Sequence, residues 1–146
     1  MRALVQSIFL YSCETWIITA EIQKRIDAME MRCFRRILNI SYQDHITNKE
    51  VLDRIHATNG KMESLFNTTK RRKLKFYGHI TRSNGLAKTC LQGTVQGGRG
   101  RGRPKKAWVD NIKEWTGLDL ITAKVAALDR PLWKKTVASS LVRVFN

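Results

Sequence analysis

The sequence predicts a mainly α-helical protein made of two small helical subdomains joined by a basic connector. Over most of the 146 residues, apolar side chains recur at spacings of three and four, which is the period of one helix face. Residue types that start and end helices flank these segments. A Gly/Arg/Pro-rich stretch over 85–106 interrupts the pattern. We therefore expect a thumb-like helical subdomain over 1–84, a connector over 85–106 and a C-terminal helical subdomain over 107–146. The sequence is also compatible with one short β-hairpin near 89–97.

The longest apolar stripe of the first subdomain follows Thr19. This residue type caps helices, and Glu21 stands in the first turn, where a carboxylate suits the helix dipole. The stripe comprises Ile22, Ile26, Met29, Cys33 and Ile37. The arginines that lie off it are interpreted as the solvated side of a core helix rather than as a contact surface. They are Arg25, Arg32, Arg35 and Arg36.

Two further helices complete the first subdomain. Thr47 and Glu50 form a capping box that predicts a helix start, and Gly60 predicts the end of that helix. The next helix is expected over 61–83, with the basic residues of "KRRKLK" on its outer arc. The two aromatic residues of "KFYGH" are interpreted as core, with stacking on bases as the alternative.

The C-terminal subdomain is expected to hold three helices. "AWVDNIKEW" is helical in pattern and Gly117 ends it. Helices over 121–128 and 130–144 follow, the second with Pro131 in its first turn, where proline is tolerated. The tryptophans of this part are interpreted as core residues rather than as platforms for bases. They are Trp108, Trp115 and Trp133.

Positive charge is concentrated in one part of the chain. The sequence has 27 Lys and Arg against 12 Asp and Glu, a formal net charge of +15. Between residues 70 and 106 there are 12 basic residues and no acidic one. A strip of this length without counter-charges favours a phosphate-binding surface over an ordinary solvated face. Nucleic acid is therefore the expected partner.

The sequence shows no pattern typical of catalysis or metal binding. It has no phosphate-binding loop, zinc-protease motif or serine-nucleophile turn, and His79 is interpreted as packed or phosphate-adjacent rather than as a general base. We therefore expect no catalytic residue, metal, cofactor or small-molecule substrate. Three widely spaced cysteines favour a reducing compartment, and hence an intracellular protein of the nucleus or cytoplasm. No window approaches the length of a spanning helix, so no membrane partner is expected.

The hexapeptide "RGRPKK" resembles the core of an AT-hook. Glycines let the backbone approach a groove closely, and arginines insert where a narrow A·T minor groove concentrates negative potential. Similar short runs also occur as linkers. Because a basic helix precedes it and a Trp-bearing helix follows it, we interpret the segment as a connector that contacts phosphate.

Five blocks occur in a fixed order along the chain: "FLYSCETW", "MEMRCFRRILNIS" followed by "TNKEV", "KRRKLKFYGHITR", "GGRGRGRPKKAWVDNIKEW" and "LDRPLWKK". In order and spacing they resemble LINE-type (non-LTR) retrotransposon reverse transcriptases, in the thumb and the region downstream of it. The resemblance covers about residues 4 to 138. It implies a fragment of an RNA-directed DNA polymerase that lies after the catalytic palm.

The resemblance also sets the limits of the expected function. The family's paired palm aspartates, which bind two Mg²⁺ ions, its endonuclease domain and its zinc knuckle have no counterpart in this sequence. We therefore expect no enzymatic activity from this chain on its own. What the resemblance implies is the role of a thumb, whose helices grip the backbone of a template–primer duplex.

The predicted nucleic-acid contacts are Lys70, Arg71, Arg72, Lys73, Lys75, Arg82, Arg99, Arg101, Arg103, Lys105 and Lys106. The ligand would be an RNA/DNA hybrid, or an RNA or DNA backbone. Two alternatives stay open: a stand-alone AT-hook-like chromatin protein, and a non-functional relic of the element. A thumb without its palm is also expected to expose an apolar face and to self-associate through it.

Overall fold

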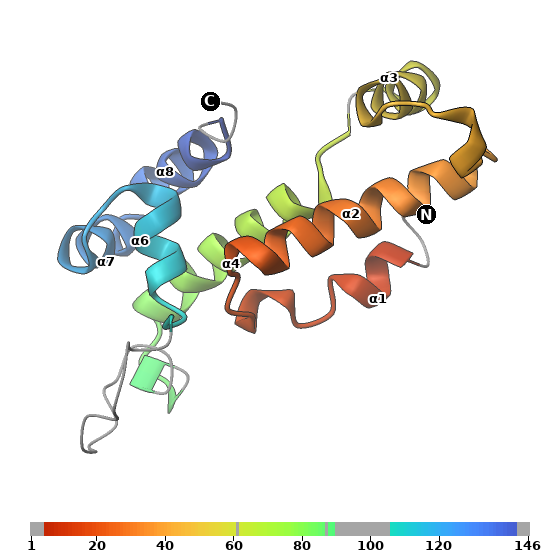
Figure 1. Ribbon diagram of the computed structural model, residues 1–146. Helices are drawn as coiled ribbons and strands as arrows, with labels where there is room; N and C mark the ends of the chain where they lie inside the picture. The colour runs from red at the N-terminus through yellow and green to blue at the C-terminus, as the bar shows by residue number, and fades with distance from the viewer. Residues whose placement is uncertain (1–4, 61, 87, 90–105, 143–146) are drawn as a thin grey trace. The chain divides into compact units, whose positions relative to one another are not determined.

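The computed structural model describes residues 5–60, 62–86, 88–89 and 106–142. This part of the chain is helical and contains no strand (Figure 1), which confirms the predicted mainly α class. The hairpin predicted near 89–97 lies outside the described residues apart from Thr89, as does most of the predicted connector. Within the described ranges, no helix has both the length and the apolar character needed to cross a bilayer.

The chain divides into two compact units. The first comprises Met1–Tyr11 and Thr19–Thr68, and the second Ser12–Ile18 and Thr69–Asn146. These boundaries differ from the predicted one after residue 84. Most of the helix that precedes the connector packs with the C-terminal helices, and so does a short segment from near the N-terminus.

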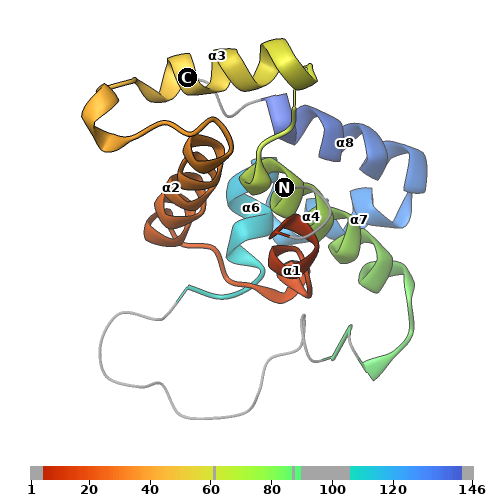
Figure 2. The same cartoon turned by 90° about the vertical axis from the view of Figure 1, so that its right-hand side faces the viewer.

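The first unit is built around two helices and a small core. Its elements are α1 (Ser7–Phe9), α2 (Ala20–Ile37), the 3-10 turn η3 (Tyr42–Asp44), α3 (Asn48–Asn59) and the first turn of α4 (Leu65–Arg82). Phe34 of α2 packs against Val51 and Ile55 of α3. Figure 2 shows these two helices joined through the segment that carries η3.

Three predicted helix ends of the first unit are confirmed, whereas the helix expected from residue 61 begins at Leu65. The Thr19 hydroxyl accepts the Ile22 N–H at 3.2 Å and so caps α2. Thr47 and Glu50 form the expected capping box at the start of α3. Gly60 follows the last residue of α3 with a φ of 71°, in the left-handed region that glycine adopts without strain.

The buried face of α2 differs from the predicted stripe. It consists of Ile26, Glu30 and Phe34, whereas Ile37 is 53% exposed. Glu30 occupies an inner position because its Oε1 accepts the Leu65 N–H at 3.0 Å. This bond satisfies one of the N–H groups that the start of α4 leaves unpaired. Burial raises the pKa of the Glu30 carboxyl, and its bond with Leu65 opposes that rise.

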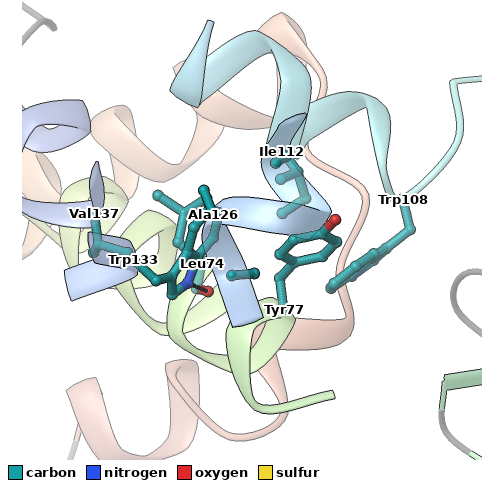
Figure 3. Packing of buried hydrophobic residues seen from close by; sticks show 9 residues of the cluster. Leu74, Tyr77, Trp108, Ile112, Ala126, Trp133 and Val137 are labelled. Atoms are coloured by element: carbon teal, nitrogen blue, oxygen red, sulfur yellow. Dashed lines mark hydrogen bonds between the residues drawn. The ribbon is translucent and has the colours of Figure 1, made fainter. Parts of the chain in front are cut away.

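The second unit gathers four helices around aromatic side chains. Its elements are the 3-10 turn η2 (Cys13–Thr15), α4 from Thr69 onward, α6 (Asp110–Thr116), α7 (Leu120–Leu128) and α8 (Arg130–Val142). The Tyr77 ring lies 6.2 Å from that of Trp108 and 5.4 Å from that of Trp133 (Figure 3). All three are buried, and Trp115 packs half-buried against the same cluster. The core roles predicted for the tryptophans and for Tyr77 are confirmed.

Local signals mark the ends of the C-terminal helices: Gly117 was predicted, and Asp119 was not. Gly117 ends α6 with a φ of 71°, and its N–H donates to the Lys113 carbonyl at 2.8 Å. The Asp119 carboxylate caps α7 by accepting the N–H groups of Thr122 and Ile121. These local signals place α6, α7 and α8 within a few residues of their expected ranges.

Candidate nucleic-acid interface

The basic run of α4 divides between the interior and the surface of the second unit. Lys70 and Lys73 are 3% and 0% exposed, whereas Arg72 and Lys75 are exposed. Residues three and four apart lie on one helix face, so Lys70 and Lys73 share the face of Tyr77. Half of the cations expected at the surface in "KRRK" therefore point inward.

Lys73 is held by acceptors from two other segments. Its Nζ donates to the Trp16 carbonyl at 2.6 Å and to Asn111 Oδ1 at 2.8 Å. The same ammonium lies 4.8 Å from the centre of the Trp108 ring and 5.5 Å from that of Trp115. Hydrogen bonds and aromatic faces together offset part of the cost of removing a cation from water.

Lys70 has a similar but separate arrangement. Its Nζ donates to the Ser140 carbonyl at 2.6 Å and lies 5.9 Å from the centre of the Trp115 ring. The expected position of Lys70 and Lys73 on the outer arc is therefore wrong, because both amines are engaged inside the unit. Their spacing of seven and four residues from Tyr77 indicated that both lysines lie on the inner face of the helix. Because lysines are seldom buried, they were nevertheless expected on the outer arc. A contact of either residue with a nucleic-acid backbone stays a prediction.

Asn111 ties the segment Ser12–Ile18 to the second unit. Its Oδ1 accepts the Ile18 N–H at 2.8 Å, and its Nδ2 donates to the Ile18 carbonyl at 2.7 Å. A further bond runs from Trp108 Nε1 to the Glu14 carbonyl at 2.9 Å. These long-range bonds explain why residues far apart in the sequence belong to one unit.

The buried ammonium predicts a pH dependence of stability. Burial lowers the pKa of Lys73 from 10.5 to about 7; Lys106 adds to this shift and Glu114 opposes it. Between these two values the unfolded chain binds more protons than the folded chain, so the free energy of unfolding is expected to rise with pH. Urea unfolding followed by tryptophan fluorescence measures this slope at several pH values from about 7 to 8.5, below the range in which Cys13 and Tyr77, whose pKa values burial raises, would oppose it. Lys73→Met is expected to flatten it.

The matched control for this experiment is Lys75→Met, which changes an exposed lysine on the same helix. It is expected to keep the wild-type slope. Burial also lowers the pKa of Lys70, so part of the slope should survive in Lys73→Met. A free energy of unfolding of the wild-type protein that falls over this pH range would contradict the lowered pKa of Lys73.

The outer face of α4 forms one wall of a basic groove, and α8 forms the other. The groove has a volume of about 680 Å³ and an apolar floor that includes Trp133 and Val137. Its basic lining residues are Arg71, Lys75, His79 and Arg82 from α4, with Arg130 and Lys134 from α8. Among the lining residues in the described part of the chain, none is acidic. We call this the α4–α8 groove.

The basic side chains of the α4–α8 groove include predicted nucleic-acid contacts and residues that were not predicted as contacts. Arg71, Lys75 and Arg82 belong to the predicted set, and Arg82 is oriented by a 2.6 Å bond from its Nη1 to the Ala127 carbonyl. Sequence reasoning missed Arg130 and Lys134. Their four-residue spacing within "LDRPLWKK" places them on one face of a helix, but only the packing of α8 brings that face opposite α4.

The other predicted contacts lie elsewhere or outside the described residues. Arg72 is exposed on α4 but does not line the groove. Lys106 pairs with Glu114, with 2.5 Å between Nζ and Oε2. The connector residues Arg99, Arg101, Arg103 and Lys105 are not among the described residues, so their role stays a prediction.

The described residues contain no metal-ligand cluster, but they do expose an apolar stripe on α7. No group of three or more potential metal ligands occurs among the residues that the structure describes. On α7, the apolar side chains of Ile121, Val125 and Leu128 are 76%, 63% and 57% exposed. They form a solvent-facing stripe opposite the buried alanines of that helix. Self-association through such a face stays a prediction.

Comparison of the chain with protein-family models, with curated proteins and with solved structures found no match. The family resemblance therefore rests on the sequence blocks alone.

Proposed function

We propose that the chain binds the phosphate backbone of a nucleic-acid duplex through the α4–α8 groove, as a thumb-type module of a LINE-type reverse transcriptase would. The observation that carries the proposal is the convergence of five Lys or Arg side chains and His79 on one groove. No catalytic step is proposed for this chain on its own.

The chemistry of the groove suits phosphate rather than base edges. Guanidinium groups present a planar fork of donors that matches phosphate oxygens, and ammonium groups act as compact charges. Cations four residues apart on α4 are separated by about 6 Å along the helix axis, so the wall presents a row of charge instead of one point. Contacts of this kind position a duplex without reading its sequence.

Removing two exposed cations from opposite walls tests the proposal. Lys75→Gln combined with Lys134→Gln is expected to weaken binding about eight-fold per lost phosphate contact at 0.1 M salt. The slope of log K against log salt concentration should become shallower by about 0.9 per contact. Fluorescence anisotropy with a labelled RNA/DNA hybrid, repeated over a salt series, measures both quantities.

Lys113→Gln combined with Lys124→Gln is the matched control. Both lysines are exposed in the second unit and neither lines the groove. Equal weakening by the two double variants would mean that net charge, not the groove, determines binding. Competition with A·T-rich duplex DNA tests the AT-hook alternative, which requires preference for that DNA and loss of binding in Arg101→Ala with Arg103→Ala.

A further inference from the structure

The first unit contains a second basic groove, which the proposed function does not use. It has a volume of about 600 Å³ and lies along α2, with Ile40 contributing from the residues after that helix and Asn48 from the start of α3. Its basic lining residues are Lys24, Arg32, Arg35 and Arg36. We call it the α2 groove.

The α2 groove occupies one continuous face of its helix. The lining positions 24, 27, 28, 31, 32, 35 and 36 recur at three- and four-residue intervals, the spacing of a single face. The buried face of α2, which includes Glu30, lies on the other side of the helix: at 3.6 residues per turn, Ala28 is about 200° from Glu30. The cations are therefore displayed away from the core of the unit.

One of these cations is fixed in place. Arg35 is half-buried, and its Nη2 donates to the Ile46 carbonyl at 2.9 Å. The neighbouring Lys24, Arg32 and Arg36 are exposed. An anchored guanidinium beside exposed ones is a partly preorganised anion site, since less side-chain freedom is lost when a ligand binds.

We propose that the α2 groove is a second binding site for a nucleic-acid phosphate backbone, separate from the α4–α8 groove. The inference deepens the proposed function and rests on it for the class of ligand. From Lys24 to Arg36 the helix rises about 18 Å, which is about five base pairs of duplex at 3.4 Å each. The four cations thus span several phosphates.

An acidic peptide helix fits this groove less well. Such a helix binds by laying a row of apolar anchors into an apolar groove. The large apolar side chains that line the α2 groove are Met31 and Ile40, which is too little for such a row. A phosphodiester backbone needs the cations and little apolar floor.

Replacing Asp27 tests the proposal with a variant that should raise the affinity for nucleic acid rather than lower it. The Asp27 carboxyl is the one acidic group among the groove's lining residues in the described chain, and it would repel a bound phosphate. Asp27→Asn is therefore expected to tighten the complex with an RNA/DNA hybrid. A weaker complex would overturn the proposal.

The main experiment uses the full chain and a labelled RNA/DNA hybrid in fluorescence anisotropy. Arg32→Gln combined with Arg36→Gln is expected to weaken binding about eight-fold per lost contact at 0.1 M salt and to reduce the salt slope by about 0.9 per contact. Arg25→Gln combined with Arg54→Gln removes two exposed cations of the same unit that do not line the groove. This control is expected to leave both quantities close to wild type.

The outcomes separate this inference from the proposed function. If the Arg32/Arg36 variant behaves like its control while Lys75→Gln with Lys134→Gln weakens binding, the α2 site is overturned and the proposed function stands. The converse result overturns the α4–α8 groove and supports the α2 site. If the Arg32/Arg36 variant loses binding to polyglutamate but not to the hybrid, the groove is a site for acidic peptide and the proposal fails. A wild-type chain that binds no hybrid at 0.1 M salt overturns both.

Discussion

Replacing Asn111 with alanine is expected to lower the free energy of unfolding of the second unit by about 1–3 kcal/mol for each buried polar group that loses its partner. The Asn111 side chain is fully buried, and its Oδ1 serves both the Ile18 N–H and Lys73 Nζ at 2.8 Å. Without it, a buried ammonium loses one of its two acceptors and the backbone of Ile18 loses a donor and an acceptor. Each such group retains its desolvation cost without a partner. Urea unfolding followed by tryptophan fluorescence measures the loss.

Asn84→Ala is the control for this substitution, because Asn84 is exposed and surface changes of this kind stay within about 0.5 kcal/mol. A double-mutant cycle with Lys73→Met adds a sharper test. Since both residues belong to one network, the double variant should lose clearly less than the sum of the single losses. Additive losses, or a loss in Asn111→Ala no larger than in the control, would rule out the network as a stabilising unit.

Gly78→Ala is expected to destabilise the second unit by about 1–3 kcal/mol, although alanine favours a helix over glycine by about 1 kcal/mol. A Cβ at Gly78 would overlap the indole of Trp133 at Cδ1 and Nε1. That indole is fixed, because its Nε1 donates to the Leu74 carbonyl at 2.8 Å and its ring packs in the core (Figure 3). The steric effect should therefore exceed the gain in helix propensity. Thermal and urea unfolding give the sign directly.

The matched control is Gly85→Ala, where an added Cβ has no atom within 4 Å. It is expected to change stability by no more than about 0.5 kcal/mol. Gly78→Ala should cost less stability in a Trp133→Leu background than in the wild-type protein, because the smaller side chain leaves room for the methyl group. A Gly78→Ala protein more stable than wild type would falsify the close helix contact.

Much of the fold was predictable because its signals are local. Thr19, the Thr47–Glu50 capping box and Gly117 each act within one helical turn of their own position. The apolar residues Trp108, Ile112 and Trp115, which follow one another at four- and three-residue spacing, likewise predicted the core of the C-terminal helices. Such signals need no knowledge of which helices pack together.

The candidate sites were only partly predictable. The sequence identified Arg71, Lys75 and Arg82 as surface cations, but it placed Lys70 and Lys73 with them. Arg130 and Lys134 were missed because the opposite wall of the α4–α8 groove is formed by a helix almost fifty residues further along the chain. The arginines of α2 were interpreted as an ordinary solvated side, since periodicity does not show whether a helix face is concave.

The sequence by itself determined the helical class, most helix ends and the excess of positive charge. Only the tertiary structure decided which cations face solvent and which support the interior. The physical reason is that a cation is buried only where other segments supply acceptors. Trp16, Asn111 and Ser140 do so for Lys73 and Lys70, and none of them is a neighbour along the helix. Periodicity describes one helix at a time, whereas burial of charge depends on the helices and segments around it.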